Sequence, residues 1–276
     1  MSYRWHKTEP LRIFVGYDQK EPLAYRVLCH SIWARATVPV SITPLVRSNL
    51  HMIHTRERGP TESTEFAFTR FLVPYLCGYE GHAVFMDCDF LCQTDVAGLW
   101  DYITTGHSAA VTVCKHDYVP KTQTKFLGQQ QTVYPRKNWS SLMVFDNTRC
   151  RKLHPLYVNT ATGLELHRFQ WLLDSEIAAL PLEWNWLAGE YDDNPTAKMV
   201  HYTLGGPWFP GYEHAPMAEA WWEEYANFLA CADLSTIRKD ELVTYGMGGA
   251  NQLQGASQRE LAVRDSCEQG REPATA

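Results

Sequence analysis

An apolar run that ends in two aspartates constrains the fold of this chain more than any other feature. Residues 83–90 read Ala-Val-Phe-Met-Asp-Cys-Asp-Phe, so a stretch with the composition of a buried strand leads directly into Asp87 and Asp89. Two carboxylates so close together repel each other and lose hydration, so a buried strand does not end this way for stability alone. Oxygen ligands at this spacing suit a hard divalent ion such as Mg²⁺ or Mn²⁺, and such sites leave room for substrate phosphates. We therefore expect a cation site and phosphate ester chemistry at the end of this strand.

The composition is that of an ordinary globular protein. The chain has 276 residues, of which 45% are hydrophobic, and a formal net charge of -6, which gives a nucleic acid partner no support. No apolar run approaches the roughly 20 residues of a transmembrane helix, and residues 1–7 lack the apolar core of a signal peptide. The eight cysteines are dispersed, which argues against a disulfide framework and a structural zinc site. We therefore expect a cytoplasmic protein.

The order of the predicted elements indicates an α/β fold. A strand over residues 12–17, a helix whose first turn contains Pro22, and a strand over residues 40–45 form a β-α-β unit. Such units build mainly parallel sheets, with binding sites at the carboxyl ends of the strands. Further expected strands are 108–114, 141–145 and 199–201, and further expected helices are 68–76, 169–180 and 218–229.

No internal repeat or linker divides the chain, so the sequence predicts a single domain over residues 1–245. Residues 246–276 are rich in Gly, Gln, Ser, Arg and Glu and contain few large apolar residues. We expect this segment to be a poorly ordered tail, and a role for it in a homo-oligomer is left open.

Two segments resemble motifs of family 8 glycosyltransferases, the glycogenin and bacterial galactosyltransferase group. Residues 85–91, together with Leu99-Trp100, resemble the metal-binding segment of that family, and residues 201–208, His-Tyr-Thr-Leu-Gly-Gly-Pro-Trp, resemble its C-terminal His-to-Pro-Trp motif. The resemblance extends from about Arg12 to Tyr212. It implies a single GT-A domain, which is a Rossmann-like, nucleotide-sugar-binding α/β fold with a mostly parallel central sheet.

The resemblance also implies a ligand set for the expected cation. In the family the histidine of the C-terminal motif completes the metal site, so the ligands here would be Asp87, Asp89 and His201. Two carboxylates and one imidazole nitrogen suit Mn²⁺ slightly better than Mg²⁺.

Further donor-site positions follow from the resemblance. Gly16, Tyr17 and Asp18 end the first strand, where Tyr17 would stack on the base of a nucleotide and Asp18 would accept hydrogen bonds from base or ribose. Arg70 matches a family arginine near the donor sugar, and its forked guanidinium suits phosphate oxygens, although a surface salt bridge is an equal alternative. Cys88 and Trp208 complete the positions expected at the donor.

The chain departs from the family pattern at three places, one of which is Trp139-Ser140-Ser141 in place of an Asn-Ala-Gly segment. The family lysine before the Pro-Trp pair is replaced by Gly206, so we expect the backbone amides of Gly205 and Gly206 to contact the diphosphate instead. The family's Asp-Gln pair near the donor sugar has no clear equivalent. Gln170, Glu165 and His167 are candidates for this role. Gln170 is predicted to be catalytic, together with Asp87, Asp89 and Arg70.

Several other polar and aromatic residues have ordinary interpretations. Asp95 and Asp101 are expected to cap helices. Asp117 is left open between a donor contact and a turn residue. Four tryptophans are expected in the core or at an interface, namely Trp184, Trp186, Trp221 and Trp222.

The sequence thus predicts a metal-dependent glycosyltransferase that moves a sugar from a UDP-sugar to the hydroxyl of a glycan or other acceptor, with retention of anomeric configuration. Two alternatives stay open. A metal-dependent nucleotidyltransferase or phosphohydrolase would use the same paired aspartates. A non-catalytic module that binds a sugar nucleotide or a partner protein would explain the missing lysine and Asp-Gln pair.

Overall fold

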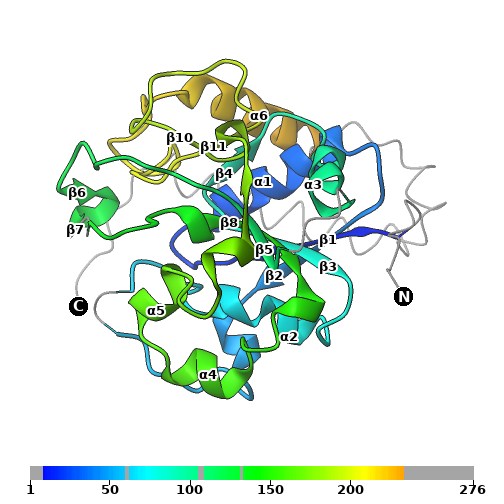
Figure 1. The fold of residues 1–276 in the computed structure, drawn as a ribbon. Coiled ribbons are helices and arrows are strands. Elements are labelled where there is room, and N and C mark those ends of the chain that lie inside the picture. The colour runs from blue at the N-terminus through cyan, green and yellow to red at the C-terminus, as the bar shows by residue number, and fades with distance from the viewer. Residues whose placement is uncertain (1–8, 60–61, 105–108, 131–132, 233–276) are drawn as a thin grey trace, which may run out of the picture. The chain divides into compact units, whose positions relative to one another are not determined.

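The computed structural model describes residues 9–59, 62–104, 109–130 and 133–232 (Figure 1). The predicted tail, residues 246–276, lies outside the described residues. The chain forms two compact units, 1–228 and 229–276, and the second is described only over residues 229–232.

A six-stranded sheet forms the core of the first unit, with the strand order β2-β1-β3-β8-β5-β9. Its strands are β1 (Leu11–Gly16), β2 (Val40–Leu45), β3 (His82–Met86), β5 (Val111–Cys114), β8 (Leu142–Asp146) and β9 (Ile177–Leu180). Strand β8 runs antiparallel to both of its neighbours, whereas the other pairs are parallel. This arrangement confirms the predicted α/β class with a mostly parallel sheet.

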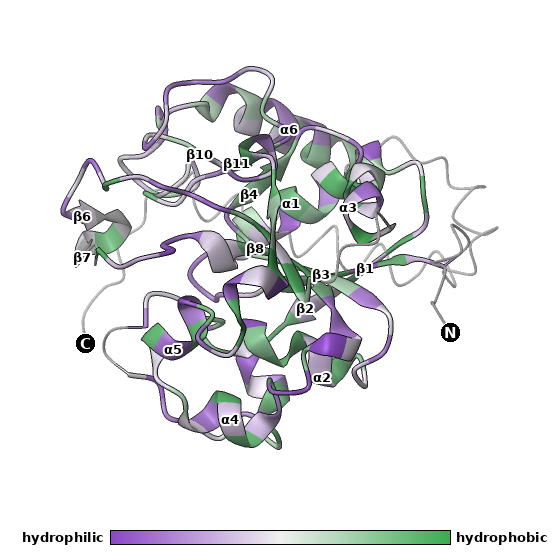
Figure 2. Cartoon of the chain, viewed as in Figure 1, coloured by the Kyte–Doolittle hydropathy of each residue, from purple (hydrophilic) through white to green (hydrophobic). Residues whose placement is uncertain are grey.

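Helices cover both faces of the six-stranded sheet. In Figure 1, α1 (Pro22–Arg35) lies on one side, and α2 (Val73–Leu76), α4 (Pro155–Thr160) and α5 (Gly163–His167) lie on the other. The central strands are therefore buried on both faces and predominantly hydrophobic (Figure 2), as expected for a sheet between two helical layers. The remaining helices are α3 (Trp100–Thr104) and α6 (Ala218–Ala232).

A second sheet of three strands follows directly on β3. Its order is β10-β11-β4, with β4 at Phe90–Cys92, β10 at Trp186–Leu187 and β11 at Met199–His201. Because β3 ends at Met86 and β4 begins at Phe90, the connection between these two strands consists of residues 87–89 alone. The two aspartates thus lie where the chain leaves one sheet for the other. A two-stranded hairpin of β6 (Thr124–Lys125) and β7 (Gln129–Gln130) completes the strands.

The prediction of a helix over residues 169–180 is wrong. Phe169 has a φ of 55°, the chain then turns, and β9 begins at Ile177. This strand pairs in parallel with β5 along its whole length. Leucine and alanine favour helices, but pairing at the edge of the sheet decides the conformation of this segment.

The helix predicted over residues 68–76 is shorter than expected. It consists of a 3₁₀ turn at Thr69–Leu72 followed by the single α-helical turn of α2. Pro74 lies in the first turn of α2. The N–H groups of a first turn have no acceptor within the helix, so proline, which has no N–H, costs no hydrogen bond there. Proline is disfavoured in the interior of a helix, which explains why the α-helix begins only at Val73.

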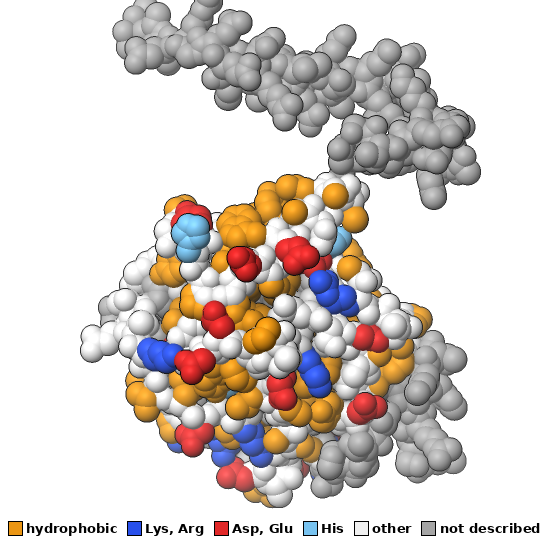
Figure 3. All heavy atoms as spheres, turned by 90° about the horizontal axis from the view of Figure 1, so that it is seen from above, with side chains coloured by type: hydrophobic (Ala, Val, Ile, Leu, Met, Phe, Trp, Pro, Cys, Tyr) orange, Lys and Arg blue, Asp and Glu red, His pale blue; other side chains and the backbone are white. Residues whose placement is uncertain are grey.

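The described surface carries mixed charge. On the face shown in Figure 3, acidic and basic side chains are interspersed among apolar ones. Within the described residues, no helix is long and apolar enough to cross a membrane.

Gly16 provides a test of the packing at the end of β1. A Cβ added there would lie 2.4 Å from the ring of Phe66, which is buried. We expect Gly16→Ala to lower the free energy of unfolding by about 1–3 kcal/mol, because the Phe66 ring would have to move within a packed core. Urea denaturation measures this change.

Gly163→Ala is the matched control, because the atom nearest to its added Cβ is Phe68 Cζ at 3.6 Å. We expect little change there. An equal change in the free energy of unfolding of the two variants would contradict the close approach of Gly16 to the Phe66 ring.

Candidate metal centre

Strand pairing brings His201 to the two aspartates. Strand β4 runs antiparallel to β11, and His201 lies opposite Phe90 in their register. The N–H of Tyr202 also donates to the carbonyl oxygen of Asp89 at 2.9 Å. A residue more than a hundred positions away is thus fixed beside the end of the Asp-x-Asp segment.

Asp87, Asp89 and His201 form a compact group of oxygen and nitrogen atoms. One ligand atom from each lies within 4.8 Å of the other two, and Nε2 of His201 is 3.3 Å from Oδ1 of Asp89. The three side chains are largely buried, with 8%, 9% and 2% of their surfaces exposed. Burial of two carboxylates is costly unless a cation compensates their charge. The group can therefore hold a divalent ion, and its donor atoms fit Mn²⁺ or Mg²⁺.

Arg70 is a buried partner of the first aspartate. Its guanidinium Nη1 lies 2.8 Å from Oδ1 of Asp87 and donates to the carbonyl oxygen of Ser140 at 2.9 Å. Only 5% of Arg70 is exposed, which excludes the alternative of a surface salt bridge. A fixed positive charge thus stands beside Asp87.

Glu21 is a buried acid that sequence reasoning did not single out for the site. It precedes Pro22 at the start of α1 and is 2% exposed. Burial, followed by the negative charges of Asp89 and Asp18, raises the pKa of Glu21 well above its usual value, and nearby Trp208 acts in the opposite direction. In the sequence, Glu21 looks like an ordinary residue at a helix start, so only the fold reveals its place among the acids.

Asp18 lies in the loop between β1 and α1, where it organises the backbone. It is 1% exposed, and its carboxylate accepts hydrogen bonds from the main-chain N–H groups of Lys20 at 2.9 Å and Glu65 at 3.0 Å. Tyr17 beside it is half-buried, with its ring edge-on to Tyr25 at 5.4 Å between centroids. Gly16, Tyr17 and Asp18 thus stand at the carboxyl end of β1, as the β-α-β unit predicts.

The loop after β11 depends on two glycines. Gly205 has a φ of 120°, and a Cβ on Gly206 would lie 2.1 Å from the ring of Trp208. Trp208 itself is half-buried and packs against the rings of Tyr202 and Trp221. A larger residue than glycine would therefore disturb the main chain at the positions predicted to contact a diphosphate.

Cys88, between the two aspartates, belongs to the hydrophobic core. Its side chain is fully buried, and burial raises the pKa of its thiol well above the usual value. The predicted contact of Cys88 with a donor would thus involve its main chain.

His167, rather than Gln170, is linked to Arg70. Gln170 is exposed, and its N–H bonds to the carbonyl oxygen of Glu165 within the same turn. His167 Nδ1 lies 2.7 Å from Oγ of Ser140, whose carbonyl oxygen binds Arg70. Burial, with a smaller effect from Arg70, lowers the pKa of His167 to about 3, so its ring is neutral near pH 7. The predicted role of Gln170 stays a prediction.

The prediction of a helix cap is confirmed for Asp95 and wrong for Asp101, which is the second residue of α3 and so lies within the helix. Asp95 caps a 3₁₀ turn by accepting from the N–H of Ala97 at 2.9 Å. Trp184 and Trp221 are fully buried, whereas Trp222 is partly exposed. Asp117 is exposed.

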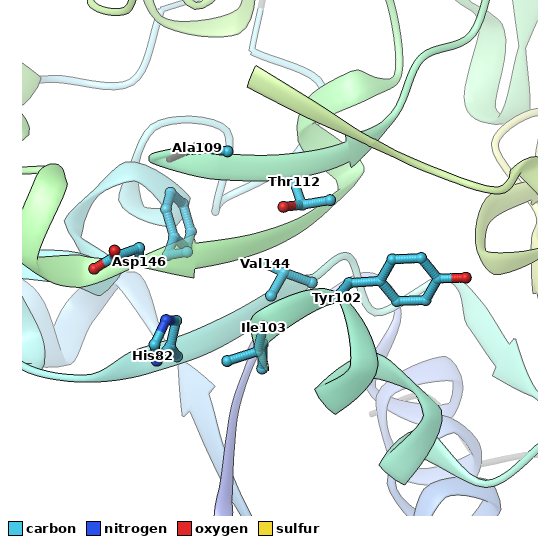
Figure 4. A pocket seen from close by; sticks show the side chains of 8 residues that line it. His82, Tyr102, Ile103, Ala109, Thr112, Val144 and Asp146 are labelled. Atoms are coloured by element: carbon cyan, nitrogen blue, oxygen red, sulfur yellow. The ribbon is translucent and has the colours of Figure 1, made fainter. Parts of the chain in front are cut away.

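Two cavities differ in size and place. The smaller has a volume of about 20 Å³ and lies over β3, β5 and β8, lined by His82, Thr112 and Val144 among others (Figure 4). This volume is enough for about one water molecule. The cavity also lies at the far end of β3 from the aspartates, because His82 is the first residue of that strand. The larger cavity has about 350 Å³ and is lined by the loop after β11, including Tyr202 and Gly205. Of the two, only the larger has room for a sugar.

Glu21 makes the stability of the metal-free protein depend on pH. Because its pKa is raised in the folded state, the folded protein keeps a proton that the unfolded chain has already lost. The stabilisation is full below the unfolded pKa of about 4.3 and is lost as the pH rises towards the folded value. We therefore expect Glu21→Gln to be more stable than the wild type near neutral pH, with the difference vanishing in mild acid.

Guanidinium denaturation at a series of pH values, with EDTA present, measures this difference. Parallel pH profiles for the two proteins would contradict the burial of Glu21 among the other acids.

Comparison with known proteins places the chain among characterised folds. No family model matches it. Protein CDI of Arabidopsis thaliana is 48% identical over 229 residues, which cover 80% of this chain and 88% of that protein. The apo structure of the bifunctional glycosyltransferase WbbM superposes with a TM-score of 0.51 at 18% identity, covering 79% of this chain and 50% of WbbM. The apo structure of the glycosyltransferase GlyE of Streptococcus pneumoniae TIGR4 superposes with a TM-score of 0.51 at 14% identity, covering 80% of this chain and 62% of GlyE.

The chain spans about half to two thirds of the length of these two structures. At such identities the likeness shows the fold, which is the GT-A fold of glycosyltransferases. The resemblance found in the sequence is therefore confirmed at the level of the fold.

Proposed function

Because this chain belongs to the same family as protein CDI of Arabidopsis thaliana and has the GT-A fold, we propose that it is a metal-dependent glycosyltransferase. The proposed reaction moves a sugar from a UDP-sugar to the hydroxyl group of a glycan or other acceptor. The observation that carries the proposal is the convergence of Asp87, Asp89 and His201 at the junction of two sheets.

The three residues would hold Mn²⁺ or Mg²⁺. When bound, the ion supplies positive charge for the two phosphates of the donor and for the diphosphate that leaves. Arg70 lies beside Asp87, within reach of the same region, and its guanidinium would stabilise negative charge on the phosphates. The main-chain amides of Gly205 and Gly206 would take the place of the family lysine on the diphosphate.

The nucleoside would occupy the carboxyl end of β1. Tyr17 would stack on the base, and Asp18, held by two main-chain N–H groups, would accept further hydrogen bonds from base or ribose. Carboxylate oxygens have spare lone pairs after one hydrogen bond each, so the two roles of Asp18 are compatible.

Retention of anomeric configuration is part of the proposal. Of the four buried acids around the site, Asp18 is assigned to the nucleoside, and Asp87 and Asp89 would be occupied by the ion. The raised pKa of Glu21 disfavours the ionised form that a nucleophile needs. We therefore favour attack by the acceptor hydroxyl on the same face as the departing phosphate, whose oxygen takes the proton of the hydroxyl. The bond from the sugar to the phosphate breaks as the bond to the acceptor oxygen forms.

Asp89→Asn tests the role of the metal. We expect the variant to lose Mn²⁺-dependent UDP binding and sugar transfer, because an amide is a poor replacement for a charged ligand. Calorimetry with UDP, in the presence of Mn²⁺ or of EDTA, measures the first effect. EDTA should abolish binding to the wild type, and added Mn²⁺ should restore it.

Asp95→Asn is the matched control, since asparagine caps a helical turn as well as aspartate does. Normal UDP affinity in Asp89→Asn with metal present would sink the assignment.

Arg70→Gln tests the proposed contact with the phosphates. We expect transfer to slow by roughly 10²-fold, because a donor to the developing charge is lost. The transfer rate of Arg70→Lys should lie between those of Arg70→Gln and the wild type. Lysine keeps the positive charge but lacks the forked guanidinium that also binds Ser140. Initial rates of UDP release with an acceptor present measure the effect, and wild-type rates in Arg70→Gln would contradict it.

The choice of acceptor separates the proposal from its alternatives. Release of UDP into water alone is compatible with a phosphohydrolase, whereas transfer to a glycan acceptor requires a glycosyltransferase. UDP binding without turnover across a panel of acceptors would favour a non-catalytic module.

A further inference from the structure

One buried amide links His201 to the segment that holds Asp87. The side chain of Asn185 is fully buried, and its Oδ1 lies 2.9 Å from Nδ1 of His201. Its Nδ2 donates to Oγ of Ser141 at 2.8 Å, and the carbonyl oxygen of Ser141 accepts from the N–H of Asp87 at 2.9 Å. Asn185 thus links His201 in β11 to the main chain of Asp87, which follows β3.

A main-chain carbonyl fixes the direction of these hydrogen bonds. The carbonyl oxygen of Asn138 can only accept, and it lies 2.7 Å from Oγ of Ser141 and 3.3 Å from Nδ2 of Asn185. Ser141 therefore donates its single hydroxyl proton to Asn138 and accepts from Asn185 through a lone pair. The amide of Asn185 must present its nitrogen on this side, which leaves its oxygen facing His201.

The direction passes on to the imidazole ring. An amide oxygen accepts and never donates, so Nδ1 of His201 carries a hydrogen atom. In the neutral ring the lone pair then belongs to Nε2. This is the nitrogen that lies 3.3 Å from Oδ1 of Asp89, on the side of the candidate metal centre.

The stacking of Phe90 on His201 does not determine which ring nitrogen faces the candidate metal centre. Its ring lies parallel to that of His201, with centroids 4.4 Å apart and an angle of 14° between the planes. Stacking fixes the plane of the imidazole but accepts either of the two orientations related by a half-turn, because such torsions are broad and roughly two-fold. The contact with Asn185 distinguishes the two nitrogens.

We propose that Asn185 is a positioning residue that sets the tautomer of His201 and turns the lone pair of Nε2 towards the metal. Partners of this kind raise metal affinity by orienting a ligand before the ion arrives. The effect of Asn185 on metal binding rests on the proposed function, whereas the tautomer of His201 is a property of the metal-free protein. Each of these two claims can therefore be refuted without the other.

The first test is the protonation of His201 in the metal-free wild type. Nitrogen-15 NMR of ¹⁵N-histidine-labelled protein, at a pH where the ring is neutral, distinguishes a protonated from an unprotonated ring nitrogen. The His201 signals are identified by their loss in His201→Gln. We expect Nδ1 to carry the proton. A proton on Nε2 would overturn the proposal whether or not the protein binds metal.

The second test is the affinity of the protein for Mn²⁺ alone, measured by the electron paramagnetic resonance signal of the free ion. We expect Asn185→Leu to bind Mn²⁺ roughly 10- to 100-fold more weakly than the wild type. Asn185→Asp keeps an oxygen that accepts from Nδ1 and should recover most of the affinity. Equal affinity in the wild type and Asn185→Leu would overturn the proposal.

Asn147→Leu is the matched control for removal of a buried amide. Asn147 is fully buried and donates to the carbonyl oxygen of Glu80, near the start of β3 rather than its end. Its replacement should destabilise the fold but leave Mn²⁺ affinity unchanged. A comparable loss of Mn²⁺ affinity in Asn147→Leu would mean that general destabilisation explains the effect of Asn185→Leu. That result would overturn the positioning role of Asn185. Absence of Mn²⁺ binding by the wild type would instead refute the proposed function, while the NMR result still decides the tautomer.

Discussion

The antiparallel pairing of β4 with β11 is the constraint on which the candidate metal centre depends. The main chain leaves the six-stranded sheet after Met86 and enters the three-stranded sheet at Phe90, so the aspartates lie on the short connection between them. His201 reaches this connection because it is paired with Phe90. A slip of one residue in that register would turn the histidine to the other face of the sheet. The fold therefore positions the site through backbone hydrogen bonds, before any contact between side chains.

Negative charge is the cost of this arrangement. Asp18, Glu21, Asp87 and Asp89 are all buried near one another, and the charges of the three aspartates disfavour the ionisation of Glu21. Arg70 offsets the charge of Asp87, whereas the raised pKa of Glu21 favours the protonated form of this acid. A bound divalent cation would relieve the remaining repulsion. The same imbalance that costs stability in the metal-free protein thus favours cation binding.

The sequence predicted the parts of the site that local patterns carry. An apolar run followed by Asp87 and Asp89 is visible without any structure, because strand periodicity and carboxylate spacing are local. His201 was found only through its resemblance to a family motif, since nothing in a single sequence states which strands pair. Glu21 could not be recognised, because its burial is produced by packing between distant segments. The segment 169–180 was misjudged for a related reason: its residues favour a helix, but an edge of the sheet offers them a partner.

The central claim is that Asp87, Asp89 and His201 bind one ion, and the nitrogen ligand is its most distinctive part. Electron spin echo modulation of Mn²⁺ bound together with UDP detects a directly coordinated imidazole nitrogen. The account predicts a nitrogen coupling in the wild type that disappears in His201→Gln while Asp95→Asn retains it. A wild-type complex without nitrogen coupling, or a coupling that persists in His201→Gln, would contradict the account.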